Sequence, residues 1–552
     1  MPFIKGLKYR VNYGHNLRQG QHYYASEYGA SLTGLAYKST NHYYDYTLDN
    51  IVTYERKFGE HNFTLTGLYG AIERKSSSTY AEGKGFERLT LGYNSLQTAN
   101  IFTLSSDAYS EALNYQMGRL NYNYSGKYLM TATIRRDGFS GFADNNKYGV
   151  FPSASMGWVA SKEDFFKDIN ALNYLKLRVG YGAIGNQTTR YSSIAKVNTR
   201  PAYVFGDGGS TAFGQYVTSL ANPDLRWERT VGLNVGVDFI TLNNRLSGTL
   251  EYYNNDTHDL LYSVNIPSLT GFSSILTNLG QLKNKGLEAS LTYQVLDNDR
   301  FHWETTFNIW RNTNEIVSLL GKDDDGDGKE DDLIASNLFI GRSIGTIYNY
   351  RAGDIYQLAD DIPEGFYPGT LRVEDLNGDD KWDAEHDRTF LGRTEPAYSF
   401  SIYNTFSYNS FTLSFLINSI QGGKDGYLGN SLVSYSRGDL SLRQNQLYGI
   451  DFWSPSNPNG KYPRNISGSG TVVTPPMYEV RSFVRLQDIS LSYSLPGTLL
   501  SRIKANRVSI YASAKNLATW TKWDGLDPEI GSNSAGGRPV MRPVTFGIRV
   551  TY

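Results

Sequence analysis

The sequence predicts an all-β protein, a transmembrane antiparallel β-barrel, and three observations lead to this fold class. Apolar and polar residues alternate along many segments, and short turns alternate with long polar connections. The chain also lacks any run near the ~20 apolar residues that a membrane helix requires. A barrel strand needs no such run, because only every second residue of the strand faces lipid.

The end of the chain shows the alternation most clearly. Phe546, Ile548, Val550 and Tyr552 fall on one face of a strand, and the residues between them, such as Arg549, fall on the other. Side chains change face at every residue of a strand, so this period of two predicts a strand with one apolar face. The same period recurs in segments 175–183, 231–239, 287–295 and 411–417.

The connections between these strands alternate in length. Short turns are expected at 59–62, 125–127, 241–244, 297–300 and 408–410. Long polar connections are expected at 17–46, 76–111, 137–149, 186–228, 254–282, 318–396, 421–481 and 519–540. Membrane barrels have short periplasmic turns and long extracellular loops, whereas a soluble sandwich has no reason to keep this parity. We therefore expect about sixteen strands of roughly ten residues each.

One segment, 161–170, departs from the strand pattern. It carries the Ser-x-x-Asp spacing of a helix start, so the sequence predicts a turn or two of helix there.

Composition and motifs exclude several functions. The net charge of −1 argues against a nucleic-acid partner, and the lack of Cys excludes a disulfide framework and a cysteine-rich metal site. The seven His show no HExxH spacing, and neither a Gly-x-Ser-x-Gly elbow nor a phosphate-binding Gly-Lys-Ser/Thr loop occurs, so we expect no enzyme. Residues 1–5 do not start a secretory signal, which an outer-membrane protein needs. We therefore expect a fragment that lacks its N-terminus.

Seven segments spread over most of the chain carry motifs in a recognisable order. They are RRDGFSGFADNNKYGVFPSASMGW at 135–158, LKLRVGYGAIGNQ at 175–187, NPDLRWE at 222–228, NKGLE at 284–288, FWSPSNPNGKYPR at 452–464, RLQDISLSY at 485–493 and GLDPEIG at 525–531. These segments closely resemble the SusC/RagA family of TonB-dependent outer-membrane transporters. The resemblance implies a location in the outer membrane of a Gram-negative, Bacteroidetes-like cell.

The resemblance also implies a function, partners and a domain organisation. Such a protein imports a nutrient, an oligosaccharide or a peptide, with a SusD-like lipoprotein outside the cell and TonB in the periplasm. Plugged transporters have about 22 strands, so about six strands and the plug domain would be absent. Residues 1–552 would be the C-terminal part of the barrel with its long extracellular loops, and TonB would act through the missing N-terminal region. Two alternatives stay open: a passive outer-membrane porin, and a surface binding protein without transport.

The connection 318–396 contains two acidic clusters with the spacing of a calcium loop, in which several oxygens converge around a turn glycine. The first places Gly328 at position 6, and its acids at positions 1, 3, 5 and 9 are Asp323, Asp325, Asp327 and Asp331. The second resembles the D-x-N-G-D-G loop of SusC relatives, with Asp380 in place of the turn glycine and a closing acid one residue late. Its candidate ligands are Asp375, Asn377, Asp379, Asp383 and Asp387.

Each cluster has two interpretations. It either binds a structural calcium ion that stiffens the connection for docking of the lipoprotein, or it is a solvated acidic loop. Apart from this calcium, no cofactor is expected, and no substrate-binding residue can be assigned. Aromatic residues in the long connections line a glycan path, or they form an interfacial girdle and pack the loops, which is the favoured interpretation. They include Tyr23, Tyr24, Tyr43, Tyr44, Tyr80, Tyr203, Tyr427, Trp453 and Tyr462.

Overall fold

Nearly all regular structure among the residues that the structure describes is β. The computed structural model describes residues 4–26, 34–166, 169, 171–199, 202–204, 211–426, 451–464, 472–473, 475–503, 505–524, 527–531 and 540–551. Sixteen strands form one sheet, which confirms the predicted all-β class and the expected number of strands. Within these described ranges, no helix is both long and apolar enough to cross a membrane.

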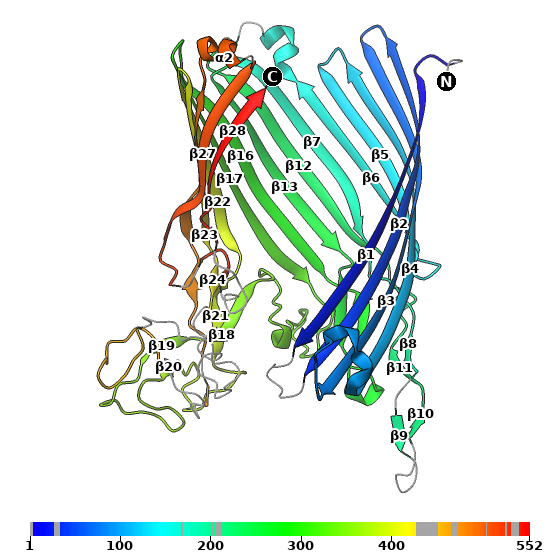
Figure 1. Ribbon diagram of the computed structural model, residues 1–552, viewed down its shortest axis with the longest axis vertical. Coiled ribbons are helices and arrows are strands. Elements are labelled where there is room, and N and C mark those ends of the chain that lie inside the picture. Colours follow the sequence, from blue (N-terminus) through cyan, green and yellow to red (C-terminus); the bar gives the residue numbers. More distant parts are fainter. Residues whose placement is uncertain are drawn as a thin grey trace. The chain divides into compact units, whose positions relative to one another are not determined.

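The sheet is a meander, because each strand neighbours the next of these strands along the chain (Figure 1). In sheet order the strands are β1 (Leu7–Ser26), β2 (Leu35–Phe58), β3 (His61–Phe86), β4 (Ala99–Tyr124), β5 (Tyr128–Phe139), β6 (Tyr148–Val159), β7 (Leu172–Asn186), β12 (Glu228–Thr241), β13 (Leu246–His258), β16 (Gln281–Asp297), β17 (Phe301–Ser318), β22 (Pro396–Tyr408), β23 (Phe411–Gly422), β26 (Phe483–Ser494), β27 (Arg507–Thr521) and β28 (Val544–Thr551).

The long connections contain short elements of their own. The strands pair two by two and are β8 (Lys196–Asn198), β9 (Ala202–Val204), β10 (Thr211–Phe213), β11 (Tyr216–Ser219), β14 (Leu261–Asn265), β15 (Ser274–Asn278), β18 (Thr346–Tyr350), β19 (Ala352–Ile355), β20 (Leu371–Val373), β21 (Arg388–Arg393), β24 (Lys424–Asp425) and β25 (Glu479–Val480). The described helical segments are α2 (Gly497–Ile503) and the 3-10 turns η1 (Gly92–Asn94), η2 (Leu96–Thr98), η3 (Ala160–Lys162), η4 (Asp164–Phe166), η5 (Ser268–Thr270) and η6 (Ile334–Ser336).

The chain divides into two compact units, each with buried clusters beneath its connections. The first comprises Met1–Glu163, Leu177–Val235 and Asn254–Lys283, and the second comprises Asp164–Lys176, Gly236–Tyr253 and Asn284–Tyr552. A buried cluster of the first unit is Phe139, Phe142 and Leu225. Buried clusters of the second unit are Tyr356, Phe366 and Val373, and Tyr462 and Trp523.

The five predicted short turns are confirmed. β2 ends at Phe58 and β3 begins at His61, and the other four turns likewise separate consecutive strands of the sheet. In the turn after β4, Ser125 and Gly126 both have positive φ, 51° and 66°. That conformation gives a hairpin turn the same twist as its strands.

The predicted strand length was wrong for β1 to β4, which have 20 to 26 residues. The connections expected at 17–46 and 76–111 are mostly strand: β1 pairs with β2 without interruption from Leu7 opposite Tyr54 to Ser26 opposite Leu35. The alternation disappears there because neither face of the strand is apolar. The backbone still needs partners for its N–H and C=O groups, so the ladder continues (Figure 1).

The helix expected at 161–170 is replaced, in its described residues, by the 3-10 turns η3 and η4. Glu163 lies between them, and its carboxylate accepts hydrogen bonds from Lys127, Tyr128 and Trp158. These bonds attach the segment to the neighbouring hairpin. Sequence analysis also missed α2, which begins directly after Pro496, a residue suited to a helix start.

The register of β2 to β6 separates an apolar face from a polar face. Tyr54, Leu65, Leu120, Ala132 and Ala154 lie opposite one another in a row across the five strands. The next row, one residue along, is polar and consists of Thr53, Thr66, Arg119, Thr133 and Ser153. We call these the apolar face and the polar face of β2–β6.

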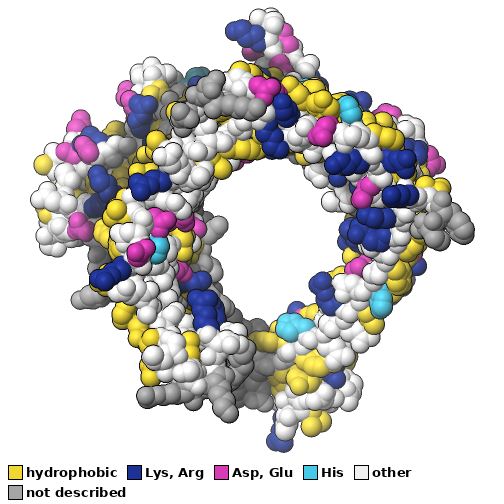
Figure 2. Space-filling model, turned by 90° about the horizontal axis from the view of Figure 1, so that it is seen from above, with side chains coloured by type: hydrophobic (Ala, Val, Ile, Leu, Met, Phe, Trp, Pro, Cys, Tyr) yellow, Lys and Arg dark blue, Asp and Glu magenta, His cyan; other side chains and the backbone are white. Residues whose placement is uncertain are grey.

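Large apolar side chains of the sheet are exposed to an extent that would be unusual in a water-soluble sheet. Leu65 is 49% exposed, Ile134 57% and Phe546 78%. Figure 2 shows hydrophobic and charged side chains interspersed on the surface. A lipid-facing surface accounts for this exposure. The expected last strand is present as β28, in which Phe546 and Ile548 are exposed, and Tyr552 lies outside the described residues.

An aromatic row lies at the short-turn end of the apolar face. Its members, which lie opposite one another in register, are Phe58, His61, Tyr124, Tyr128 and Trp158. The rings of His61 and Tyr124 are 4.7 Å apart between centroids. Such a row is typical of the girdle at a membrane–water interface.

Candidate functional site

Both acidic clusters lie in the connection between β17 and β22, in the second compact unit. The first cluster follows β17, and the second lies between β20 and β21. The second is attached to the buried cluster of Tyr356, Phe366 and Val373 through Trp382, which packs against it and donates a hydrogen bond of 3.0 Å to the carbonyl of Val373. The fold therefore holds this loop on a small apolar core.

The first loop is organised around Asp323. One carboxylate oxygen of Asp323 accepts hydrogen bonds from the backbone N–H of Gly326 (2.7 Å) and Asp327 (3.1 Å), and the other accepts one from Gly328 (2.9 Å). The side chain of Asp325 accepts a hydrogen bond from the backbone N–H of Asp327, and the side chain of Asp327 accepts one from the backbone N–H of Lys329. Gly328 has φ +84°, the left-handed conformation that the turn requires.

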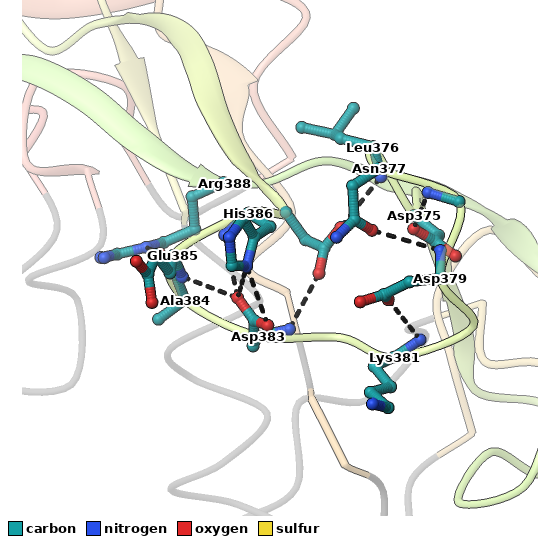
Figure 3. Close-up of polar contacts among 12 residues, drawn as sticks. Asp375, Leu376, Asn377, Asp379, Lys381, Asp383, Ala384, Glu385, His386 and Arg388 are labelled. Atoms are coloured by element: carbon teal, nitrogen blue, oxygen red, sulfur yellow. Dashed lines mark hydrogen bonds and ion pairs between the residues drawn. The ribbon is translucent and has the colours of Figure 1, made fainter.

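The second loop is organised around Asp375 in the same way. Its two oxygens accept hydrogen bonds from the backbone N–H of Gly378 (2.7 Å) and of Asp380 (2.9 Å) (Figure 3). Asp380 stands where a glycine was expected and nevertheless adopts the left-handed conformation, with φ +58°. Aspartate is one of the few side chains that tolerate it.

The two loops share one hydrogen-bond pattern. In each loop, the side chain at position 1 accepts hydrogen bonds from the backbone N–H groups of positions 4 and 6. The side chain at position 3 accepts one from the N–H of position 5, and the side chain at position 5 accepts one from the N–H of position 7. The oxygen donors are Asp323, Asp325 and Asp327 in the first loop and Asp375, Asn377 and Asp379 in the second. The spacing recognised in the sequence therefore corresponds to the same local structure twice.

The carboxylates gather more closely in the first loop. Asp323, Asp325 and Asp327 each offer an oxygen, and these oxygens all lie within 4.8 Å of one another. Across the part of the chain that the structure describes, they form the only such group of three. Asp331 does not join it, because one of its oxygens accepts a hydrogen bond of 2.6 Å from the N–H of Asp324.

Asp387, the expected closing ligand of the second loop, lies at the base of that loop. It is 1% exposed, and its two oxygens accept hydrogen bonds from the backbone N–H of Leu376 (2.9 Å) and Asp383 (2.8 Å). Asp383 itself interacts with His386, whose N–H groups lower the pKa of Asp383, while this carboxylate raises the pKa of His386. Position 9 of this loop is thus already occupied by a neighbouring side chain.

Two polar clusters that sequence analysis missed hold the last connection in place. Arg485 of β26 is 3% exposed, and its guanidinium forms ion pairs of 2.7 Å with Asp527 and with Glu529. Segments 485–493 and 525–531 were both recognised as motifs, but nothing in the sequence shows that their charges meet. The second cluster joins Asp524 to Lys461 and to the hydroxyl of Tyr462.

The aromatic residues singled out in the sequence occupy different places. Tyr23, Tyr24, Tyr43, Tyr44 and Tyr80 lie in β1, β2 and β3 rather than in loops. Trp453 and Tyr462 are 5% and 4% exposed, so both pack within the connections. Tyr203 lies in β9, and Tyr427 lies outside the described residues.

We expect the Asp524 cluster to make stability depend on pH. Hydrogen bonds from Lys461 and Tyr462 lower the pKa of Asp524 below its usual value. A carboxyl with a lowered pKa stabilises the fold above its unfolded pKa of about 4, and this contribution disappears as pH falls through the folded pKa. Asp524→Asn should therefore lower the thermal midpoint at pH 7, and the gap to wild type should close as pH falls below about 4. A gap of constant size would contradict this assignment.

Comparison with known proteins defines the class. The family described as TonB dependent receptor-like, beta-barrel matches residues 3–382. The chain therefore belongs to the TonB-dependent receptor-like β-barrel family, whose members are receptors and transporters of the outer membrane.

Individual relatives agree with this assignment. TonB-dependent receptor P3 of Formosa agariphila is 31% identical, over 100% of this chain and 57% of that protein. TonB-dependent receptor SusC of Bacteroides thetaiotaomicron is 29% identical, over 92% of this chain and 50% of that protein. The chain thus spans about half the length of the curated relatives it matches.

The fold agrees as well. The structure of the RagAB peptide transporter has a TM-score of 0.82 with 22% identity, over 99% of this chain and 60% of that chain. The similarity to SusC and the shared fold agree with the resemblance to SusC/RagA, and membership of the TonB-dependent receptor-like β-barrel family confirms the location in the outer membrane.

Proposed function

We propose that this chain is the barrel portion of an importer that carries a nutrient, an oligosaccharide or a peptide, across the outer membrane. TonB supplies the energy for import, and a SusD-like lipoprotein captures the substrate outside. The observation that carries the proposal is the family match over residues 3–382, which covers the first eleven strands of the sheet, β1 to β17.

Two features of the chain support import over the alternatives. The motifs of the SusC/RagA family keep their order along the chain, and a passive porin has no need of them. The connection between β17 and β22 is also long and internally structured, with the paired strands β18–β21 and β19–β20, as docking of a lipoprotein would require. The family contains receptors and transporters, and we propose that the chain likewise catalyses no reaction.

The test is an uptake assay in the native host. The gene of the full-length protein is deleted and restored, and cells receive a fluorescently labelled peptide digest or a labelled polysaccharide digest. We expect restoration to increase uptake of one digest, and we expect deletion of TonB or a proton uncoupler to abolish the increase. Flux that persists without TonB would identify a passive pore, and surface binding without flux would identify a binding protein. Either result would overturn the proposal.

We also propose that calcium binds the two acidic loops and stiffens their connection. In the first loop the oxygens of Asp323, Asp325 and Asp327 lie within 4.8 Å of one another, and the second loop repeats the same hydrogen-bond pattern. Such hard oxygen donors are the ligands that calcium prefers. Asp323, Asp325 and Asp327 would hold the ion in the first loop. Asp375, Asn377 and Asp379 would hold it in the second, where Asp387 already binds the backbone.

Terbium luminescence and calorimetry can separate the two loops. Trp382 lies at position 8 of the second loop, so excitation of tryptophan should transfer energy to terbium bound there. We expect Asp379→Asn to weaken this signal by about tenfold or more, and Asp325→Asn to leave it unchanged while removing one equivalent of calcium measured by calorimetry. No binding at millimolar calcium would identify both clusters as solvated acidic loops instead.

A further inference from the structure

A groove of about 640 Å³ crosses the apolar face of β2–β6, entirely within the first compact unit. Its floor is formed by Gly67 of β3 and Gly118 of β4, which lie opposite each other in register. Its walls are Val52, Leu65, Leu120 and Ile134. We call this feature the sheet groove.

The protein's own structure does not require the two glycines. Neither has a positive φ, and the register of β3 with β4 shows no bulge at this pair. A Cβ atom added to Gly67 would meet nothing within 4 Å, and one added to Gly118 would meet only a methyl group of Ile134 at 3.8 Å. Glycine inside a strand weakens it, and where no bulge or bend explains it, glycine often marks the close approach of a ligand.

The surroundings of the sheet groove define the chemistry of that ligand. The groove lies on the apolar face, whose large side chains are exposed as a lipid-facing surface requires. The walls formed by Val52, Leu65, Leu120 and Ile134 are aliphatic, so they suit a hydrocarbon chain. The lining also includes Tyr54 of the apolar face, and Thr66, Arg119, Thr133 and Ser153 of the polar face. An acyl chain of a membrane lipid is the apolar group available at this surface.

Arg136 carries the positive charge of the apolar face at one end of the sheet groove, whereas Arg119 in the lining belongs to the polar face and donates a hydrogen bond to Thr133. Arg136 follows Ile134 by two residues on β5, on the same face and about 7 Å along the strand. Its guanidinium lies 3.7 Å from the ring centroid of Tyr148 and donates a hydrogen bond of 3.2 Å to Gln116. Within the residues that the structure describes, Arg136 forms no ion pair, so its charge is open to an outside anion.

The depth of Arg136 in the membrane suits a lipid headgroup. The aromatic row marks the interface on the short-turn side, and Arg136 lies eight residues beyond Tyr128 of that row on β5. Eight residues span about 26 Å along a strand, or about 20 Å of membrane thickness at the usual tilt. The apolar band of such barrels is about 25 Å tall, so Arg136 lies near the opposite interface, on the side of the long connections.

We propose that the sheet groove binds one acyl chain of an anionic, phosphate-bearing lipid from the leaflet next to the long connections, and that its headgroup pairs with Arg136. A lipid supplies both the hydrocarbon for the groove and the anion for the guanidinium. A second copy of this chain would instead bring another Arg136 to a face that already carries one. Basic residues at an interface are common partners of anionic headgroups.

Native mass spectrometry of the full-length protein tests the lipid site. Detergent-solubilised protein is equilibrated with dioleoyl phosphatidylglycerol or with dioleoyl phosphatidylcholine, and the lipids retained by each chain are counted. We expect wild type to retain one phosphatidylglycerol. The variant Gly67→Val/Gly118→Val fills the groove, so its affinity for that lipid should fall by about tenfold, or about 1.4 kcal/mol.

Two further variants complete the design. Gly14→Val is the matched control for two reasons. A Cβ at Gly14 also meets nothing within 4 Å, and Gly14 and its cross-strand partner Thr47 lie outside the groove. It should retain lipid as wild type does. Arg136→Gln should keep binding lipid but lose the preference for phosphatidylglycerol over phosphatidylcholine.

Three results would overturn the proposal. The first is undiminished retention by Gly67→Val/Gly118→Val when its heat-modifiable band on gels shows a folded barrel. The second is equal retention of both lipids by wild type. The third is a dimer that only the double valine variant abolishes, which would assign the groove to a second copy of the chain.

Discussion

Replacing Arg485 with alanine should lower the free energy of unfolding by about 3–5 kcal/mol, the largest effect that we expect from a single side chain here. The side chains of Arg485 and Asp527 are 4% and 9% exposed, so water cannot replace a lost partner. The guanidinium also donates to Thr519 and lies 4.7 Å from the ring centroid of Phe483. Its loss would leave the carboxylate of Asp527 buried without its cation.

Urea unfolding in lipid vesicles, followed by tryptophan fluorescence, measures this effect. Lys8→Ala is the control, because it removes an ion pair with Glu55 in which the side chains are 66% and 49% exposed and should cost at most about 1 kcal/mol. If unpaired carboxylates cause the loss, the variant Arg485→Ala/Asp527→Asn/Glu529→Gln should be more stable than Arg485→Ala alone at pH 7. A cost equal to that of Lys8→Ala would show that the buried pairs do not hold the last connection.

A charge on the apolar face should have the second largest effect. Leu65 lies in the apolar row of β2–β6, opposite Tyr54 of β2. Tyr54 is four residues before Phe58, the member of the aromatic row on β2, so Leu65 lies four residues from that row. Four residues correspond to about 13 Å along the strand and about 10 Å of depth, close to the middle of the apolar band. Leu65→Arg should therefore cost about 2–4 kcal/mol, the usual penalty for arginine at that depth.

The neighbouring residue provides the matched control. Thr64 lies on the polar face and opposite Glu55, the carboxylate that also pairs with Lys8, so Thr64→Arg places its charge beside a carboxylate instead of against lipid. We expect Thr64→Arg to unfold in urea within about 1 kcal/mol of wild type. Equal destabilisation by the two arginines would contradict the assignment of the apolar face to lipid.

Much of the fold could be predicted because the membrane enforces a pattern on the residues. Strands β7, β12, β16, β23 and β28 were recognised by alternation, since one face of each meets lipid and the other does not. Where a strand no longer has lipid on one face, the alternation of apolar and polar residues ends as well. The outer halves of β1 to β4 therefore looked like loops, although backbone pairing continues through them.

The candidate site also has one part that the sequence predicted and one part that it did not. Both acidic loops were recognised from spacing alone, because every hydrogen bond of their shared pattern joins residues no more than five apart. The gathering of Asp323, Asp325 and Asp327, and the burial of Asp387, could not be inferred. They depend on how each loop packs and on which backbone N–H groups its carboxylates accept.

The order of residues along the chain was thus enough to predict an outer-membrane β-barrel that resembles the SusC/RagA family and carries two loops with calcium-binding spacing. Contacts between residues distant in sequence were not accessible in that way. The ion pair between Arg485 and Asp527, and the pairing of Gly67 with Gly118 that opens the sheet groove, exist only because separate segments come together. Alternation and spacing are properties of consecutive residues, whereas partners across strands are chosen by register and burial in the folded chain.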